Sequence, residues 1–182
     1  ATLSVVDAAD QPVDVDGAVV VGLRALGVRS QDDRIRFGLA PKNEPIRVAV
    51  SVQGEVFIAS FGPQAGNADL GSVRVSPAPR TAPVVVTYSM TSDDFAKAIL
   101  GRVTLISTDG ARIYQFNMVE KQGMLGGPKD GDANLVAPGD YYAVPGSIIN
   151  DQVVRLIDRL RSGNAAGLAD VPRVAAIKHE VR

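Results

Sequence analysis

Two strand-like runs at residues 103–108 and 111–118, separated by Asp109-Gly110, constrain this fold more than any other stretch. An Asp-Gly pair between β-rich runs is a strong hairpin signal, because a type I′ turn needs positive φ at both central residues. Tyr114 and Phe116 alternate with polar residues, which is typical of a strand with one buried face. The sequence therefore predicts an antiparallel hairpin with a two-residue turn.

The residues before this hairpin add a strand and a short helix. The run at 84–88 is rich in β-branched residues, which strands prefer. In the following segment, 91–100, Thr91-Ser92 supplies a hydroxyl N-cap, and Asp93 and Asp94 place negative charge in the first turn. We therefore expect a strand, a short capped helix and the hairpin in succession.

A second hairpin is predicted at residues 46–52 and 55–61, which flank Gln53-Gly54. The weak alternation of residues 2–7 indicates an edge strand. Shorter strand-like runs occupy residues 18–21, 34–39 and 72–75.

A helical stripe of apolar residues marks the C-terminal part of the chain. Apolar residues recur at helical spacing from residue 149 to residue 160, and Arg159 and Arg161 suit the negative end of a helix. Ser162-Gly163-Asn164 ends this helix. We expect residues 163–182 to form an extended tail with a strand near residues 173–181.

Composition narrows the fold class. The 182 residues are 46% hydrophobic but only 5% aromatic, so the core is aliphatic, and 18 Gly and 11 Pro suit many short elements. We expect one domain spanning residues 1–182. Its predicted class is mainly β, an antiparallel sandwich or jelly-roll-like fold with the mid-chain helix and the C-terminal amphipathic helix.

The Gly- and Pro-rich residues 122–147 are expected to form a long loop or arm. Asp130, Asp132 and Asn134 match the first ligand positions of a calcium loop, but Leu135 and Tyr141 stand where its Gly and Glu belong. A solvated turn is the alternative for these residues. Metal binding is therefore only a weak candidate.

Catalytic signatures are missing. The chain has no cysteine and a single histidine, His179, which excludes thiolate chemistry and multi-histidine zinc sites. A Ser-His-Asp arrangement would have to use His179. No phosphate-binding loop with its Lys-Ser pair is present. We therefore predict a protein that is not an enzyme and needs no cofactor.

Basic residues gather towards the C-terminus, although the formal net charge is −1. A nucleic-acid contact there would use the following residues: Arg155, Arg159, Arg161, Arg173 and Lys178. Aromatic residues are not interleaved with these bases, and a solvated helix face is the alternative interpretation. Nucleic acid is thus a partner with limited support.

These observations favour a structural subunit that self-assembles, of the viral or phage coat type, located in a virion or other particle. Loop tyrosines are often contact residues, although Tyr141 and Tyr142 folding back on the core is the alternative. The predicted subunit interface consists of Tyr141, Tyr142, Leu156, Leu160, Val174 and Ile177.

Two other functional classes stay open. One is a secreted or periplasmic β-sandwich module that binds through residues 122–147, and the other is an enzyme of unidentified class. No apolar run approaches the eighteen residues of a membrane-spanning helix, and no signal-peptide pattern is visible, so no membrane partner is expected.

Overall fold

The fold is mainly β, with several antiparallel sheets, and the chain divides into two compact units, Ala1–Pro77 and Ala78–Arg182. The structure is a computed structural model. It describes residues 1–21, 26–31, 34–38, 45–63, 68–84, 87–89, 102–117, 120–121, 124–126, 134–148, 151–164, 166, 168–169, 171 and 173–176. The predicted single domain is not tested by this division and stays a prediction.

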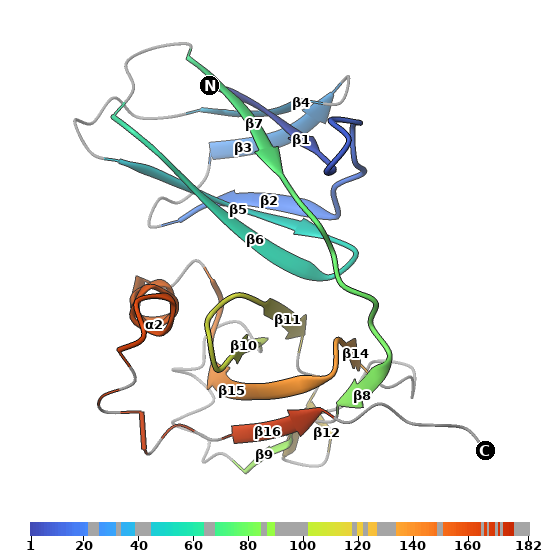
Figure 1. The fold of residues 1–182 in the computed structure, drawn as a ribbon, viewed down its shortest axis with the longest axis vertical. Coiled ribbons are helices and arrows are strands. Elements are labelled where there is room, and N and C mark those ends of the chain that lie inside the picture. Colours follow the sequence, from blue (N-terminus) through green and yellow to red (C-terminus); the bar gives the residue numbers. More distant parts are fainter. Residues whose placement is uncertain are drawn as a thin grey trace. The chain divides into compact units, whose positions relative to one another are not determined.

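The described part of unit 1 contains seven strands, which Figure 1 labels. They are β1 (Thr2–Val6), β2 (Gly17–Val20), β3 (Leu26–Gln31), β4 (Arg34–Gly38), β5 (Ile46–Val52), β6 (Glu55–Phe61) and β7 (Asp69–Arg74). One sheet has the order β3-β4-β1-β7, and β5 lies between β2 and β6 in the other strand set. β1 is antiparallel to β4 and parallel to β7. The expected edge strand at residues 2–7 is therefore an interior strand of its sheet.

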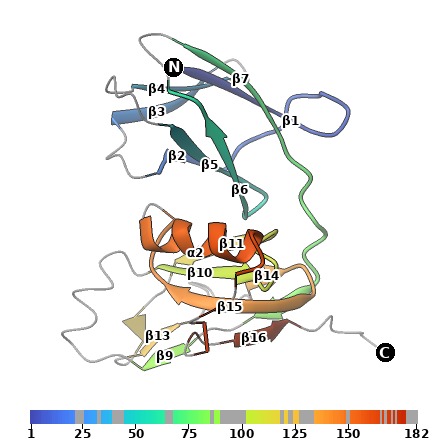
Figure 2. The ribbon, with the colours of Figure 1, turned by 60° about the vertical axis from the view of Figure 1, so that its left-hand side comes forward.

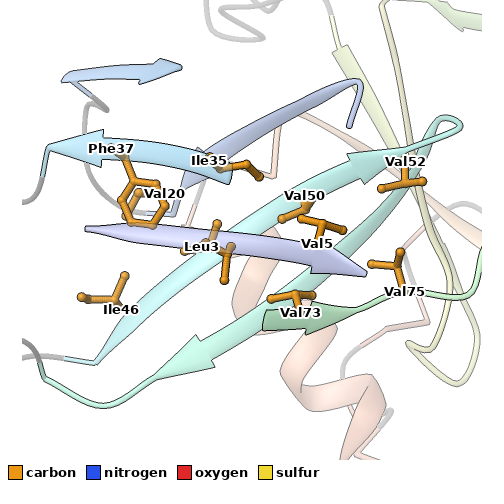
Figure 3. Close-up of a cluster of buried hydrophobic side chains, with 11 residues drawn as sticks. Leu3, Val5, Val20, Ile35, Phe37, Ile46, Val50, Val52, Val73 and Val75 are labelled. Atoms are coloured by element: carbon orange, nitrogen blue, oxygen red, sulfur yellow. The ribbon is translucent and has the colours of Figure 1, made fainter. Parts of the chain in front are cut away.

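The core of unit 1 lies between these two sets of strands, as in a β-sandwich. Figure 3 shows Leu3 and Val5 of β1 directed towards Val50 of β5, with Val20 and Val73 beside them. Alternate residues of β1 and β4 are buried, and the intervening residues face outward. The fold class predicted from composition and periodicity is confirmed.

The hairpin predicted around Gln53-Gly54 is also confirmed. β5 and β6 pair from Ile46 opposite Phe61 to Val52 opposite Glu55. Gln53 has φ of 50° and Gly54 has φ of 75°, the positive values that a type I′ turn requires. This tight turn fixes the register of the longest strand pair in unit 1.

Unit 2 contains the remaining described strands and one described helix. The strands are β8 (Ala82–Val84), β9 (Thr87–Ser89), β10 (Arg102–Ser107), β11 (Ile113–Asn117), β12 (Glu120–Lys121), β13 (Met124–Gly126), β14 (Asn134–Val136), β15 (Gly139–Pro145) and β16 (Arg173–Ala176). β10 pairs with β11 and β15, and β15 pairs with β16, all antiparallel. β8 pairs with β14, and β13 lies between β12 and β9.

The hairpin expected around Asp109-Gly110 forms between β10 and β11, but its turn is longer than predicted. Ser107 N–H donates to Arg112 O at 2.9 Å, and Gly110 N–H donates to Ser107 O at 2.8 Å. The loop therefore has four residues, a form commonly built around a type I turn. Hydrogen bonds from Ser107 and from the Ala111 N–H lower the pKa of Asp109, so this carboxylate stabilises the turn in its ionised form.

The helix α2 (Asp151–Arg161) confirms the C-terminal amphipathic helix, and Figure 2 shows it running along β10 and β15. Asn164 N–H donates to Arg159 O, and Gly163 N–H donates to Leu160 O, both at 2.9 Å. With φ of 74° at Gly163, these bonds form a Schellman motif. The predicted helix stop is therefore correct.

The long loop predicted for residues 122–147 is wrong for the residues that the structure describes. β13, β14 and β15 lie within this range, and β15 is paired on both sides, with β10 and β16. Among the described residues, Pro138 lies between β14 and β15, and Gly139 begins β15. The mid-chain helix expected at residues 91–100 lies outside the described residues. Within the described part of the chain, no helix is long and apolar enough to cross a membrane.

Gly110 should tolerate substitution less well than Gly163, because two constraints act at Gly110 and only one at Gly163. Both glycines have positive φ, 71° and 74°, but a Cβ at residue 110 would lie 3.0 Å from the Leu160 Cβ, whereas nothing lies within 4 Å at residue 163. Left-handed backbone costs a non-glycine residue about 1–2 kcal/mol, and overpacking adds about 1–3 kcal/mol. We expect Gly110→Ala to lower the free energy of unfolding by about 2–5 kcal/mol and Gly163→Ala by about 1–2 kcal/mol, measured by urea denaturation. Equal losses would show that the turn and α2 are not in contact.

Candidate interaction surface

The outer face of the sheet β3-β4-β1-β7 carries two rows of polar residues. The first row runs across the strands through Arg36, Thr2 and Asp69, and the second runs through Arg34, Ser4 and Ser72. These positions alternate with the buried residues Leu3, Val5, Ile35 and Phe37. The packing of the core thus fixes which residues the sheet presents outward.

Two arginines are directly opposite each other on β3 and β4. Arg29 of β3 is the register partner of Arg36 of β4, and residues so placed have Cβ atoms about 4.5–5.5 Å apart. Arg36 is exposed, and no hydrogen bond or ion pair joins it to another described residue. Like charges in this arrangement destabilise a sheet. Arg29 and Arg36, hereafter the arginine pair, are thus backbone register partners on adjacent strands, and Arg36 is exposed.

Asp69 of the first row and Arg34 of the second show how a carboxylate pairs with an arginine on this face. Arg34 Nη1 donates to Asp69 Oδ2 at 3.3 Å, and both side chains are about half exposed. Asp69 therefore neutralises Arg34, whereas no bond joins Arg36 to another described residue. Thr2 and Ser4 add half-buried hydroxyl groups beside these guanidinium groups.

The free edge of this sheet at β7 is protected against strand pairing. The register between β1 and β7 shifts between Thr2 and Ser4, and Gly71 has φ of 78°. Asp69 Oδ1 accepts a hydrogen bond from Gly71 N–H at 2.9 Å, which holds this irregular conformation. Irregular backbone and charged side chains are the usual protection of edge strands. The β7 edge is therefore poorly suited to pairing with a further strand.

A segment rich in aspartate follows β1, and Figure 2 shows it looping away from the end of that strand. Asp7 Oδ1 accepts from Ala9 N–H at 2.8 Å and from Gln11 N–H at 2.9 Å, which shapes the turn. Asp10 is ion-paired with Arg74 and raises the pKa of that guanidinium group. We call residues 7–16 the acidic segment.

The last two aspartates of the acidic segment differ from each other. Asp16 Oδ2 accepts from Gly54 N–H at 2.7 Å and so supports the β5–β6 turn. Asp14 is exposed, and no bond joins it to another residue in the described part of the chain. Asp14 is thus the carboxylate of this segment that is most available to a partner.

The tyrosines predicted as interface anchors lie in the core of unit 2. Tyr141 and Tyr142 are 1% and 2% exposed, on β15. Tyr141 Oη donates to Ala137 O at 2.7 Å, Ala137 N–H donates to Tyr114 Oη at 3.2 Å, and the two rings meet edge to face at 5.8 Å. These rings support the fold of the chain itself, which is the alternative that the sequence analysis left open. As they lie, they do not form an exposed contact surface.

The other predicted interface residues are distributed differently. Leu156 is half-buried and Leu160 is buried on α2, while Val174 belongs to β16. Ile177 lies outside the described residues. A subunit interface at these positions stays a prediction.

Three of the arginines predicted to contact nucleic acid make bonds within unit 2. Arg161 Nε donates to Gly110 O at 3.0 Å, and Arg159 donates to Ala166 O. Arg173 Nη2 donates to Tyr142 Oη at 2.8 Å, with the Arg173 Cζ 5.0 Å from the ring centroid. These bonds do not bring the three side chains into one patch.

The remaining sequence-predicted residues give no further support for a site. Arg155 is exposed on α2, and Lys178 lies outside the described residues, so nucleic-acid contact stays a prediction. Asp130 and Asp132 also lie outside them, whereas Asn134 is half-buried in β14. No group of three potential metal ligands occurs in the described part of the chain.

The arginine pair was missed by sequence reasoning. The only available signal was the alternation of Arg34 and Arg36 with apolar residues, which placed both on the polar face of one strand. Pairing with Arg29 depends on the register of β3, which includes an irregularity between Leu26 and Arg29. Sequence spacing alone does not reveal that register.

Comparison of the chain with protein-family models, with curated proteins and with solved structures found no match.

Removing either hydroxyl of the tyrosine pair should destabilise unit 2. Tyr141→Phe leaves the buried Ala137 carbonyl without this donor, and Tyr114→Phe leaves the Ala137 N–H without this acceptor. An unsatisfied buried group costs about 1–3 kcal/mol. We expect each variant to lower the free energy of unfolding by that amount, measured by chemical denaturation. A neutral effect of both would contradict the role assigned to these hydroxyls.

Replacing Arg36 should stabilise the protein at low ionic strength. Arg36→Thr removes the like charge opposite Arg29 and places a β-favouring residue on the strand. We expect the free energy of unfolding to rise by a few tenths to about 1 kcal/mol, and the gain to shrink at about 1 M salt. Arg34→Thr is the matched control. It makes the same substitution on the same strand, but it removes the ion pair with Asp69. Destabilisation by Arg36→Thr would contradict the proposed repulsion.

Proposed function

We propose that the chain is a non-enzymatic structural subunit that self-assembles through the polar surfaces of unit 1. The observation that carries this proposal is the separation of unlike charges there. Arg36 lies on the outer face of one sheet, opposite Arg29 in register, and the acidic segment follows the end of β1. Complementary charged patches on one molecule favour association between copies of that molecule.

The overall charge agrees with this proposal. A large net charge keeps proteins monomeric through mutual repulsion, whereas a net charge near zero promotes association. The formal net charge of this chain is −1, so copies repel one another only weakly. Short-range attraction between oppositely charged patches then determines whether two copies associate.

A coat or shell subunit is the form of assembly that we favour within this class. The alternative of a binding module relied on residues 122–147 as a free loop. The described residues of that range belong largely to paired strands, and their tyrosines are buried. This observation lowers the support for that alternative.

Self-assembly is tested by sedimentation velocity of the wild-type chain over a hundredfold range of concentration, at low and at about 0.5 M salt. We expect species larger than the monomer that grow with concentration and diminish with salt, because exposed charges are screened. Arg80→Gln is the control, since Arg80 is exposed and makes no bond with another described residue. A wild-type monomer under every condition would overturn the proposed function.

A further inference from the structure

We infer that copies of the chain associate by exchanging β1, so that β1 of one copy lies between β4 and β7 of the next, an inference that rests on the proposed self-assembly. β1 is an interior strand of its sheet, antiparallel to β4 and parallel to β7. Leu3 and Val5 are 0% and 2% exposed, and Figure 3 shows them in the core of unit 1. The place between β4 and β7 is therefore shaped for this strand, and β1 of a second copy is the partner that fits it.

Exchange replaces each contact of β1 with the same contact to another copy. These contacts include the backbone pairing with β4 and β7, the bond from Thr2 N–H to Ala68 O at 2.9 Å, and the bond from Val75 N–H to Val6 O at 2.8 Å. Swapping an identical element between copies is a low-cost route to association for this reason. The connection that follows β1, together with the protein concentration, therefore sets the balance between closed and exchanged chains.

This connection begins with residues 7–11 of the acidic segment, which turn the chain back along β1. Asp7 N–H donates to Gln11 O at 2.9 Å, and Asp10 N–H donates to Asp7 O at 3.2 Å. Residues 8–11 are exposed, so water replaces these bonds when the turn opens, and the net loss for each is small. Residues 7–11 are therefore the hinge of the exchange.

The closed hinge holds one residue in an unfavourable backbone conformation. Asp10 has φ of 58°, in the left-handed region that is costly for side chains other than glycine, although less so for aspartate than for β-branched residues. The ion pair between Asp10 and Arg74 is exposed on both sides, and such pairs contribute little to stability. Opening the hinge lets Asp10 adopt extended backbone, and strained hinge turns favour swapping.

Exchange of β1 gives the proposed assembly a source of cohesion that polar surfaces lack. Attraction between the polar surfaces brings copies together, and the apolar side chains of an exchanged β1 then hold them. Reciprocal exchange closes a dimer, whereas passing β1 from each copy to the next builds rings or open chains. In each arrangement every copy gives one strand and receives one.

An engineered disulfide tests the exchange, because the chain has no cysteine of its own. Ser4 and Arg34 are register partners on β1 and β4. Ala1 and Phe37 exchange both backbone bonds, so by alternation Ser4 and Arg34 form a non-hydrogen-bonded pair, whose Cα atoms lie about 4.5 Å apart, within the reach of a disulfide. We expect Ser4→Cys/Arg34→Cys, oxidised after assembly at low salt, to form covalently linked chains on a non-reducing denaturing gel.

The matched control is Arg47→Cys/Ser60→Cys, which joins β5 and β6 of one hairpin. This disulfide forms within one chain whether or not β1 is exchanged, so the control should give single chains only. A mixture of Ser4→Cys chains and Arg34→Cys chains should form a disulfide between unlike chains, because only exchange places β1 of one copy on β4 of another.

Two substitutions of Asp10 test the hinge without cysteine. Both lose the ion pair with Arg74, but glycine adopts φ of 58° freely, whereas valine resists it. We expect the association constant of Asp10→Val to exceed that of Asp10→Gly by about tenfold. Sedimentation velocity at low salt measures both variants, and their melting temperatures confirm folding.

The outcomes separate this inference from the function on which it rests. A wild-type chain that stays monomeric overturns both. Assembly in which Ser4→Cys/Arg34→Cys forms disulfides only within single chains overturns the exchange and leaves self-assembly standing. Equal association of Asp10→Val and Asp10→Gly likewise removes residues 7–11 as the hinge.

Discussion

The register of β1 is the constraint on which the rest of unit 1 depends. Leu3 and Val5 enter the core, so Thr2 and Ser4 must face outward, because side chains alternate along a strand. β4 pairs with β1 on one side and follows the same alternation, and β7 pairs with it on the other side through a register that shifts between Thr2 and Ser4. A slip of one residue would bury the hydroxyls and expose the leucine and valine. The apolar core therefore determines which polar residues share the outer face.

Unit 2 meets a different constraint, because its core contains hydroxyl groups. Tyr114 and Tyr141 bury large rings, and each hydroxyl needs a hydrogen-bond partner away from water. Ala137 supplies both, a donor for one ring and an acceptor for the other. This arrangement fixes the short connection between β14 and β15, and it explains why tyrosines from a Gly- and Pro-rich stretch are not available on the surface.

Local sequence signals predicted the parts of the fold that local physics determines. Positive φ at Gly54 and Gly163 produces a tight hairpin turn and a helix stop, and both were predicted from neighbouring residues. The interior position of β1 was not predicted, because its partner β7 lies more than sixty residues along the chain. Residues 134–145 were interpreted as a loop for the same reason. Their strands are stabilised by partners from distant segments, which override weak local preference.

The candidate surface was the least predictable part of the structure, because core packing does not determine the residues that face solvent. Core packing decides the identity of Ile35 and Phe37, but position 36 faces solvent and is free of that demand. Strand preference at such a position favours threonine or valine, and a residue opposite Arg29 gains nothing locally from carrying a positive charge. Natural sequences depart from local rules chiefly where function requires it. The charge at position 36 is therefore explained neither by core packing nor by strand preference.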